Sequence, residues 1–214
     1  MSTAKDSTPE RVMAYIDGFN LYFGLNDKGW RRYLWLDLPA MIKHLLKPHQ
    51  ELVGVKYFTT RVGKPAESVR RQTTFLDALA VRGGVEFVFG NFIWGDVECN
   101  ECGRTWMQRE EKQTDVSIAV HMICDSFAGD FDTCLLVCGD SDQVPAVREL
   151  VEKHHRRVVV ASPPARVSND LNAAASAHFT IGRQAFAANQ MPTMVPNPAT
   201  GYVLAQPAEW WVQE

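Results

Sequence analysis

Short apolar runs alternate with longer amphipathic stretches along most of the chain, and this alternation limits the fold more than any other feature. The runs are rich in β-branched and aromatic side chains and lie at residues 12–16, 52–58, 85–89, 135–138 and 158–161. Runs of this length and composition are typical of buried parallel strands. The stretches between them predict helices at residues 39–47, 66–81, 114–127 and 142–154.

Strands that alternate with helices predict an α/β protein with a doubly wound, Rossmann-like parallel sheet. Right-handed crossovers favour the strand order 3-2-1-4-5, with helices on both faces of the sheet. The helix predicted at 114–127 has an apolar face formed by Val116, Ala119, Val120 and Ile123. That periodicity predicts a helix that packs this face against the sheet.

Two segments interrupt the alternation and define the expected domain organisation. Residues 92–110 contain a tight turn flanked by aromatic residues, which predicts a β-hairpin inserted into a domain that spans residues 11–183. Residues 1–10 are polar, and we expect them to be disordered. Residues 184–214 are rich in proline and predict an irregular tail, whose Trp210 and Trp211 are expected to dock on the domain or on a partner.

The overall composition is that of a globular protein and excludes several other classes. Hydrophobic residues make up 46% and charged residues 22% of the chain, which argues against a disordered protein. No apolar run has the roughly 18 residues that a membrane span needs, so we expect no membrane association. We also expect no secretory signal, reduced cysteines and a cytoplasmic location. The net charge of −3 provides no general attraction to nucleic acid.

Acidic residues follow two of the predicted strands and begin one of the helices. Asp17 ends the first strand, Asp140 and Asp142 follow the fourth, and Asp115 lies in the first turn of a helix. Carboxylates that converge from separate segments repel one another unless a hard cation lies between them. Each has a structural alternative, because Asp also caps helices and forms turns. Taken together, the acids favour a cation site.

Three segments resemble the NYN family of the PIN-like nuclease superfamily: YIDGFNLYFG, EKQTDVSIAVHMICD and LLVCGDSDQVPAVRELV. The resemblance covers residues 11–183 and implies a PIN-type sheet whose strand-end acids bind divalent metal for RNA cleavage. It assigns the metal-binding, catalytic positions to Asp17, Asp115, Asp140 and Asp142. It also assigns a supporting amide to Asn20, a lysine near the phosphate to Lys112 and a hydroxyl close to the ligands to Ser141.

The resemblance therefore implies a metal-dependent ribonuclease with Mg²⁺ or Mn²⁺ as cofactor. In this chemistry a bound metal ion lowers the pKa of a water molecule, which then attacks the phosphodiester. Arg31 and Arg32 follow Trp30, an arrangement that suits single-stranded RNA through phosphate contact and base stacking. The same residues equally fit a solvated helix face. The aromatic hairpin and the tryptophan-rich tail lead us to expect a homodimer or higher oligomer.

The predicted hairpin contains the pair Cys99 and Cys102, whose spacing lets both thiolates bind one metal ion. A structural zinc site needs four ligands, and the sequence has no second pair of this kind. Three interpretations remain open: a Zn²⁺ site completed by distant residues or by a second subunit, a redox pair, or a hairpin with unused thiols.

Three other functions fit part of the pattern. Some bacterial relatives in the NYN resemblance are described as NADH-dependent monooxygenases of 6-hydroxypyridine compounds, such as 6-hydroxy-3-succinoylpyridine, although this chain has no GxGxxG fingerprint. A phosphatase of the haloacid dehalogenase type also has an Asp after its first strand. Its motif requires a second carboxylate two residues later, where this chain has Phe19. The third alternative is a non-catalytic RNA-binding module.

Overall fold

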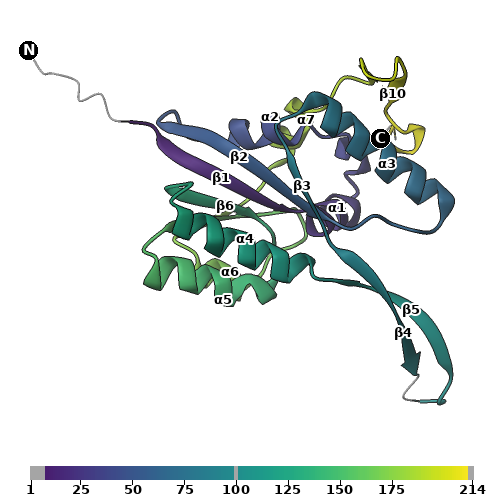
Figure 1. Cartoon of the computed structure of the whole chain (residues 1–214), viewed down its shortest axis with the longest axis horizontal. Coiled ribbons are helices and arrows are strands. Elements are labelled where there is room, and N and C mark those ends of the chain that lie inside the picture. The colour runs from purple at the N-terminus through teal and green to yellow at the C-terminus, as the bar shows by residue number, and fades with distance from the viewer. Residues whose placement is uncertain (1–7, 99–100, 212–214) are drawn as a thin grey trace, which may run out of the picture.

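The computed structural model describes residues 8–98 and 101–211, with the backbone alone for residues 92–98 and 106–112. Its centre is a parallel sheet of six strands in the order β3-β2-β1-β6-β7-β8 (Figure 1). The predicted order of the first five strands is confirmed, and a sixth strand extends one edge. The strands are β1 (Glu10–Asp17), β2 (Gln50–Thr59), β3 (Glu86–Phe89), β6 (Thr133–Val137), β7 (Arg157–Ser162) and β8 (Ala177–Thr180).

Helices cover both faces of the sheet, as the sequence predicts (Figure 1). One face carries α1 (Gly18–Asp27), α2 (Leu38–Leu45), α3 (Ala66–Arg82) and α7 (Arg183–Ala188). The other carries α4 (Thr114–Ala128), α5 (Val144–Arg148) and α6 (Asn169–Ala174). The helix predicted at 142–154 consists of a 3₁₀ turn (Ser141–Gln143), α5 and a π-helical turn (Glu149–Lys153). Shorter 3₁₀ turns lie at Arg31–Tyr33 and Ala208–Trp210.

The alternation of side chains along β1 supplies both hydrophobic cores. Ala14 and Ile16 belong to the core under α1, α2 and α3, whereas Tyr15 belongs to the core under α4 and α5. All three residues have no exposed surface. A strand that is buried on both faces reads as a continuous apolar run, which explains why the sequence pattern located this strand correctly.

The buried face of α4 matches the prediction in part, because Ala119 and Ile123 pack against the core. Val116 and Val120, expected to pack on the sheet, are 66% and 51% exposed, whereas Ile118 and Met122 are fully buried. The buried face also contains Asp125, whose carboxylate accepts a hydrogen bond from Tyr15 Oη at 2.7 Å and pairs with Lys56 Nζ at 2.7 Å. A polar residue held in this way belongs to the core, although hydrophobic periodicity does not identify it.

The inserted hairpin is a two-stranded antiparallel ribbon formed by β4 (Asn91–Glu98) and β5 (Thr105–Lys112). The ribbon projects away from the body of the molecule (Figure 1). Cys99 lies outside the described residues, and Cys102 is an exposed free thiol. The zinc site at this pair therefore stays a prediction.

The C-terminal tail packs on the same face as α3. It contains a small antiparallel pair, β9 (Met194–Pro196) with β10 (Val203–Ala205), in place of the irregular arm that was expected. Trp210 is 3% exposed, and its ring lies 6.3 Å from that of Trp35 and 6.0 Å from that of Phe75. Trp211 is 59% exposed. One of the two tail tryptophans is thus part of the core.

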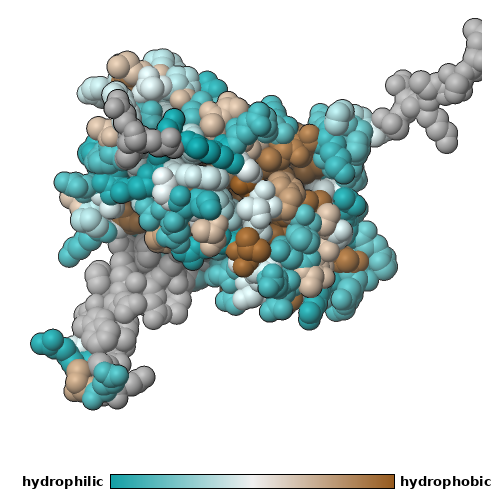
Figure 2. Space-filling view, turned by 180° about the vertical axis from the view of Figure 1, so that it is seen from behind, coloured by the Kyte–Doolittle hydropathy of each residue, from teal (hydrophilic) through white to brown (hydrophobic). Residues whose placement is uncertain are grey.

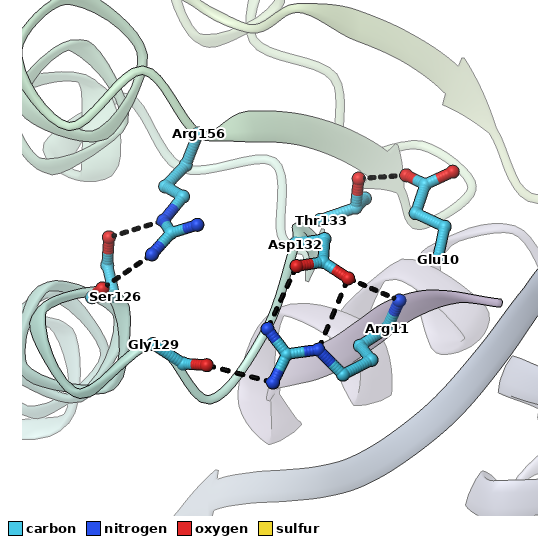
Figure 3. Close-up of polar contacts among 7 residues, drawn as sticks. All are labelled: Glu10, Arg11, Ser126, Gly129, Asp132, Thr133 and Arg156. Carbon is cyan, nitrogen blue, oxygen red and sulfur yellow. Dashed lines mark hydrogen bonds and ion pairs between the residues drawn. The ribbon is translucent and has the colours of Figure 1, made fainter. Parts of the chain in front are cut away.

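Polar contacts hold β1 to β6 at their amino ends, opposite the edge where the acidic residues gather (Figure 3). Arg11 donates to both oxygens of Asp132, at 2.9 Å and 3.2 Å, and to the Gly129 carbonyl at 2.9 Å. These bonds from Arg11 lower the pKa of the Asp132 carboxyl. Thr133 donates a hydrogen bond to Glu10, which lowers the pKa of that carboxyl as well. The pairing of the two central strands is therefore anchored by charge at this end.

Two findings concern the surface. Among the described residues, no helix is both long and apolar enough to cross a membrane. Apolar side chains gather in one area of the face shown in Figure 2, whereas the rest of that face is largely hydrophilic. The large exposed hydrophobic side chains include Phe127, Met194 and Tyr202. The expected homodimer stays a prediction.

Candidate active site at the carboxyl edge of the sheet

Asp17 and Asp140 lie at the same edge of the sheet because they follow two neighbouring parallel strands. Ile16, the residue before Asp17, is in register with Val137 of β6. Asp17 accepts a hydrogen bond from the Asn20 N–H at 2.9 Å and caps α1. Asp140 accepts one from the Asp142 N–H at 3.0 Å and caps the following turn. The capping role considered for Asp142 thus belongs to Asp140 and Asp17.

A cavity of about 250 Å³ lies at this edge and contains most of the predicted site. We call it the acidic cavity. Three of the four predicted acids line it, each from a different segment, and it is completed by polar and aromatic residues. Its lining consists of Asp17, Phe19, Asn20, Phe23, Gln113, Thr114, Asp115, Asp140 and Arg166. The acids therefore meet as the strand order predicts.

Three predicted residues are placed elsewhere or lie outside the description. Asp142 and Ser141 are exposed, lie in the turn that Asp140 caps, and are not among the residues that line the acidic cavity. This differs from the expectation that all four acids face one cleft. The side chain of Lys112 lies outside the described residues, although its backbone ends β5 just before Gln113.

Cys138 connects the two strand-end acids through its buried thiol. The S–H group donates to Asp17 Oδ2 at 3.6 Å, and the sulfur accepts from the Asp140 N–H at 3.2 Å. Burial and the nearby Asp17 charge raise the pKa of the thiol well above its usual value, so it stays protonated and able to donate. Beside it, the Gly139 N–H donates to Asn20 Oδ1 at 3.0 Å. These contacts fix the ends of β1 and β6 relative to each other.

Arg166 brings positive charge to the acidic cavity and was missed by the sequence analysis. It follows β7, and the loop carrying it packs so closely that a Cβ on Gly139 would lie 2.1 Å from the Arg166 carbonyl oxygen. Its guanidinium pairs with Asp27 and lies 5.8 Å from the centre of the Phe23 ring. Its place after a predicted strand could have indicated a role at the site, because ligands in open α/β sheets bind beyond the carboxyl ends of the strands.

The donor set fits a hard, partly hydrated cation. Among residues 8–98 and 101–211, as far as their side chains are described, no group of three His, Cys, Asp or Glu is arranged to hold a metal ion. Mg²⁺ keeps several waters and is usually bound through one or two carboxylates together with substrate phosphate. Asp17, Asp115 and Asp140 bring carboxylates, and Asn20 an amide, to the lining of the acidic cavity, which are donors of the type that Mg²⁺ takes. A fully protein-coordinated site of the zinc type is not formed by these residues.

Comparisons with known proteins agree with this architecture. The chain is 28% identical over 254 residues to a 6-hydroxy-3-succinoylpyridine 3-monooxygenase from Pseudomonas putida, an alignment that covers 100% of this chain and 79% of the relative. A crystal structure of a Vibrio parahaemolyticus protein of unknown function superposes with a TM-score of 0.56 at 19% identity, covering 84% of this chain and 98% of the other. The family model of the NYN domain matches residues 11–182. The chain therefore belongs to the NYN domain family.

Proposed function

We propose that this protein is a metal-dependent ribonuclease that hydrolyses phosphodiester bonds of single-stranded RNA in the acidic cavity. The observation that carries the proposal is the convergence of three carboxylates from separate segments, Asp17, Asp115 and Asp140, on one cavity at the carboxyl edge of the sheet. Membership of the NYN family supports nuclease chemistry at this position. A bound divalent cation would supply an activated water and neutralise charge on the phosphate.

The residues of the chain have distinct roles in this proposal. Asp17 is 5% exposed and is held by Asn20 and Cys138, so its carboxylate is positioned before any ligand binds. Asp140 is fixed in the same way by its own cap and by the Cys138 sulfur. Arg166 also lines the acidic cavity, and its guanidinium, which pairs with Asp27, is a planar cation suited to a phosphate oxygen pair. Asp142 stays a predicted ligand, and the variant Asp142→Asn in the same assays would test it.

The test is cleavage of a labelled single-stranded RNA in Mg²⁺ or Mn²⁺, with Asp140→Asn compared with Asp77→Asn. Both changes remove one carboxylate charge at nearly constant shape, but Asp77 is an exposed residue of α3 outside the acidic cavity. We expect cleavage by the Asp77 variant and none by the Asp140 variant. Full metal-dependent cleavage by Asp140→Asn would refute the assignment, and RNA binding without cleavage by the unmodified protein would favour a binding module.

Metal binding has a readout that does not depend on cleavage. A ligand present at one hundred times its dissociation constant stabilises the folded state by about 2.7 kcal/mol. Mg²⁺ or Mn²⁺ should therefore raise the melting temperature of the unmodified protein and of Asp77→Asn. The increase should be lost in Asp17→Asn and Asp140→Asn. An equal increase in all four proteins would place the cation elsewhere.

A second candidate is the monooxygenase reaction in the name of the Pseudomonas putida relative. The observation that favours it is the length of the similarity, which covers 100% of this chain. The assay is oxidation of NADH that depends on 6-hydroxy-3-succinoylpyridine, run beside the RNA assay. Turnover in this assay with no RNA cleavage would replace the ribonuclease proposal.

A further inference from the structure

A second cavity lies on the other side of α1 from the acidic cavity. Its volume is about 290 Å³, and its walls are mostly aliphatic and aromatic. We call it the apolar cavity. Its walls come from α1, the segment at residues 34–38, strand β2, helix α3 and the C-terminal tail, and include Leu21, Tyr22, Leu36, Tyr57, Phe75 and Trp210. Its size is near the lower limit for ligand cavities, so it fits one planar ring system better than a folded ligand.

The two cavities share an aromatic wall. Phe19 and Phe23, one turn apart on α1, line both of them. Their rings stack with centroids 6.2 Å apart and an interplanar angle of 25°. Phe23 is 44% exposed although it is a large aromatic residue. A ligand that occupies both cavities would therefore contact these two rings.

Apart from the polar atoms of Tyr22, Tyr57 and Trp210, the polar groups of the apolar cavity are few and lie on the β2–α3 side. They are Thr59, Lys64, Ser68, Arg71 and Gln72. Arg71 is already paired with Glu209 at 3.4 Å, whereas Lys64 makes no ion pair with any described residue and is exposed. Gln72 is engaged with the backbone of Thr60 and Val62. The cavity thus combines apolar walls with a single available cation.

We infer that the apolar cavity binds one nucleobase of the RNA, adjacent to the phosphodiester held in the acidic cavity. The inference rests on the proposed ribonuclease function and specifies how its substrate is recognised. A planar heteroaromatic base matches the aromatic walls, and Lys64 is placed for the phosphate of the next nucleotide. Because every base has a π-face, this arrangement selects single strands with an unstacked base rather than a particular sequence.

The first arm of the test changes the RNA and leaves the protein unmodified. Binding of a short fluorescent oligouridine is measured in Ca²⁺ and compared with a series in which one nucleotide at a time lacks its base. Loss of a stacked base should weaken binding about tenfold or more at a single position, next to the cleavage site mapped in Mg²⁺. Equal binding across the whole series would overturn the inference.

The second arm fills the cavity. Val62 lines it, and its backbone contact with Gln72 does not involve the side chain, so Val62→Trp places an indole in the cavity without removing that contact. Val120→Trp is the matched control, because Val120 is 51% exposed on α4 and lines neither cavity. We expect Val62→Trp to weaken binding of intact RNA and to show no further loss with the abasic RNA. Binding equal to that of Val120→Trp contradicts the inference.

The remaining outcomes separate this inference from the proposed function. If RNA cleavage and binding are insensitive both to the missing base and to Val62→Trp, the proposed ribonuclease function stands and the inferred nucleobase site is wrong. If the unmodified protein does not cleave RNA, the proposed ribonuclease function is wrong. Free 6-hydroxy-3-succinoylpyridine is included as a separate ligand. If it binds the unmodified protein but not Val62→Trp, while RNA binding is unaffected, the cavity takes a free small molecule and the inference is wrong.

Discussion

Gly139 follows β6 and packs closely against the loop after β7. The substitution Gly139→Ala tests this contact. A Cβ at this position would lie 2.1 Å from the carbonyl oxygen of Arg166 and 2.6 Å from its carbonyl carbon. Both are backbone atoms, so no side-chain rotation relieves the overlap. The loop would have to move by about an ångström, which also shifts Arg166 in the acidic cavity.

The expected loss of stability is at the upper end of values for overpacking, about 3 kcal/mol. For a chain of this size, this loss corresponds to a decrease of about 9 °C in melting temperature. Urea unfolding followed by circular dichroism measures the free energy directly. Gly182→Ala is the control, because a Cβ there meets no atom within 4 Å and the backbone has an ordinary φ of −77°.

The free energy of unfolding of Gly182→Ala should lie within about 0.5 kcal/mol of that of the unmodified protein, because the substitution changes an uncrowded surface position. If Gly139→Ala behaves like Gly182→Ala, the loop does not contact β6 in the way described. The position of Arg166 in the acidic cavity would then be wrong as well. RNA cleavage by Gly139→Ala at a temperature where it is folded should be reduced, since the loop carrying Arg166 is displaced.

Three further predictions follow from other contacts. Asp125→Asn removes the charge 2.7 Å from the ammonium of Lys56, whose side chain is 12% exposed and keeps the longer 3.8 Å ion pair with Glu86, and urea unfolding should show a loss of about 3 kcal/mol. Because Arg11 lowers the pKa of Asp132 below its ordinary 3.8, this carboxylate stabilises the fold above that pH and the effect disappears as pH falls further. The stability difference between the unmodified protein and Asp132→Asn should therefore be present at neutral pH and vanish in strong acid, and a constant difference would contradict this. If the ribbon binds zinc, protein purified without chelator should contain the metal and Cys99→Ser should release it, whereas less than about a tenth of a zinc per chain would exclude the site.

The parts of the fold that follow from short-range pattern were predictable. The buried strands are continuous apolar runs, and the parallel order brings the ends of β1 and β6 together, so Asp17 and Asp140 were located correctly at one edge. The sheet also has β8, whose burial alternates and whose apolar signal is weak. Helix α1 was not predicted, because it begins directly at Gly18 with no separating turn.

The parts that depend on tertiary contacts were not predictable from one sequence. The buried face of α4 contains Asp125, and only the contacts with Tyr15 and Lys56 show why a carboxylate is placed there. Arg166 reaches the acidic cavity because its loop packs against two glycines, Gly24 and Gly139, that are distant in sequence. Periodicity describes which face of an element is apolar, but it does not describe which loop covers the end of a strand.

The ribbon of β4 and β5 is joined directly to the wall of the acidic cavity. The ribbon ends at Lys112, and the next residue, Gln113, has a positive φ of 79° and lines the cavity two positions before Asp115. Asn91 Nδ2 donates to Gln113 Oε1 at 3.1 Å, so both strands of the ribbon meet at this junction. Buried Ile118 and Met122 hold the rest of α4 against the sheet. A movement of the ribbon relative to the sheet would therefore reach the wall of the acidic cavity at Gln113, two residues before Asp115.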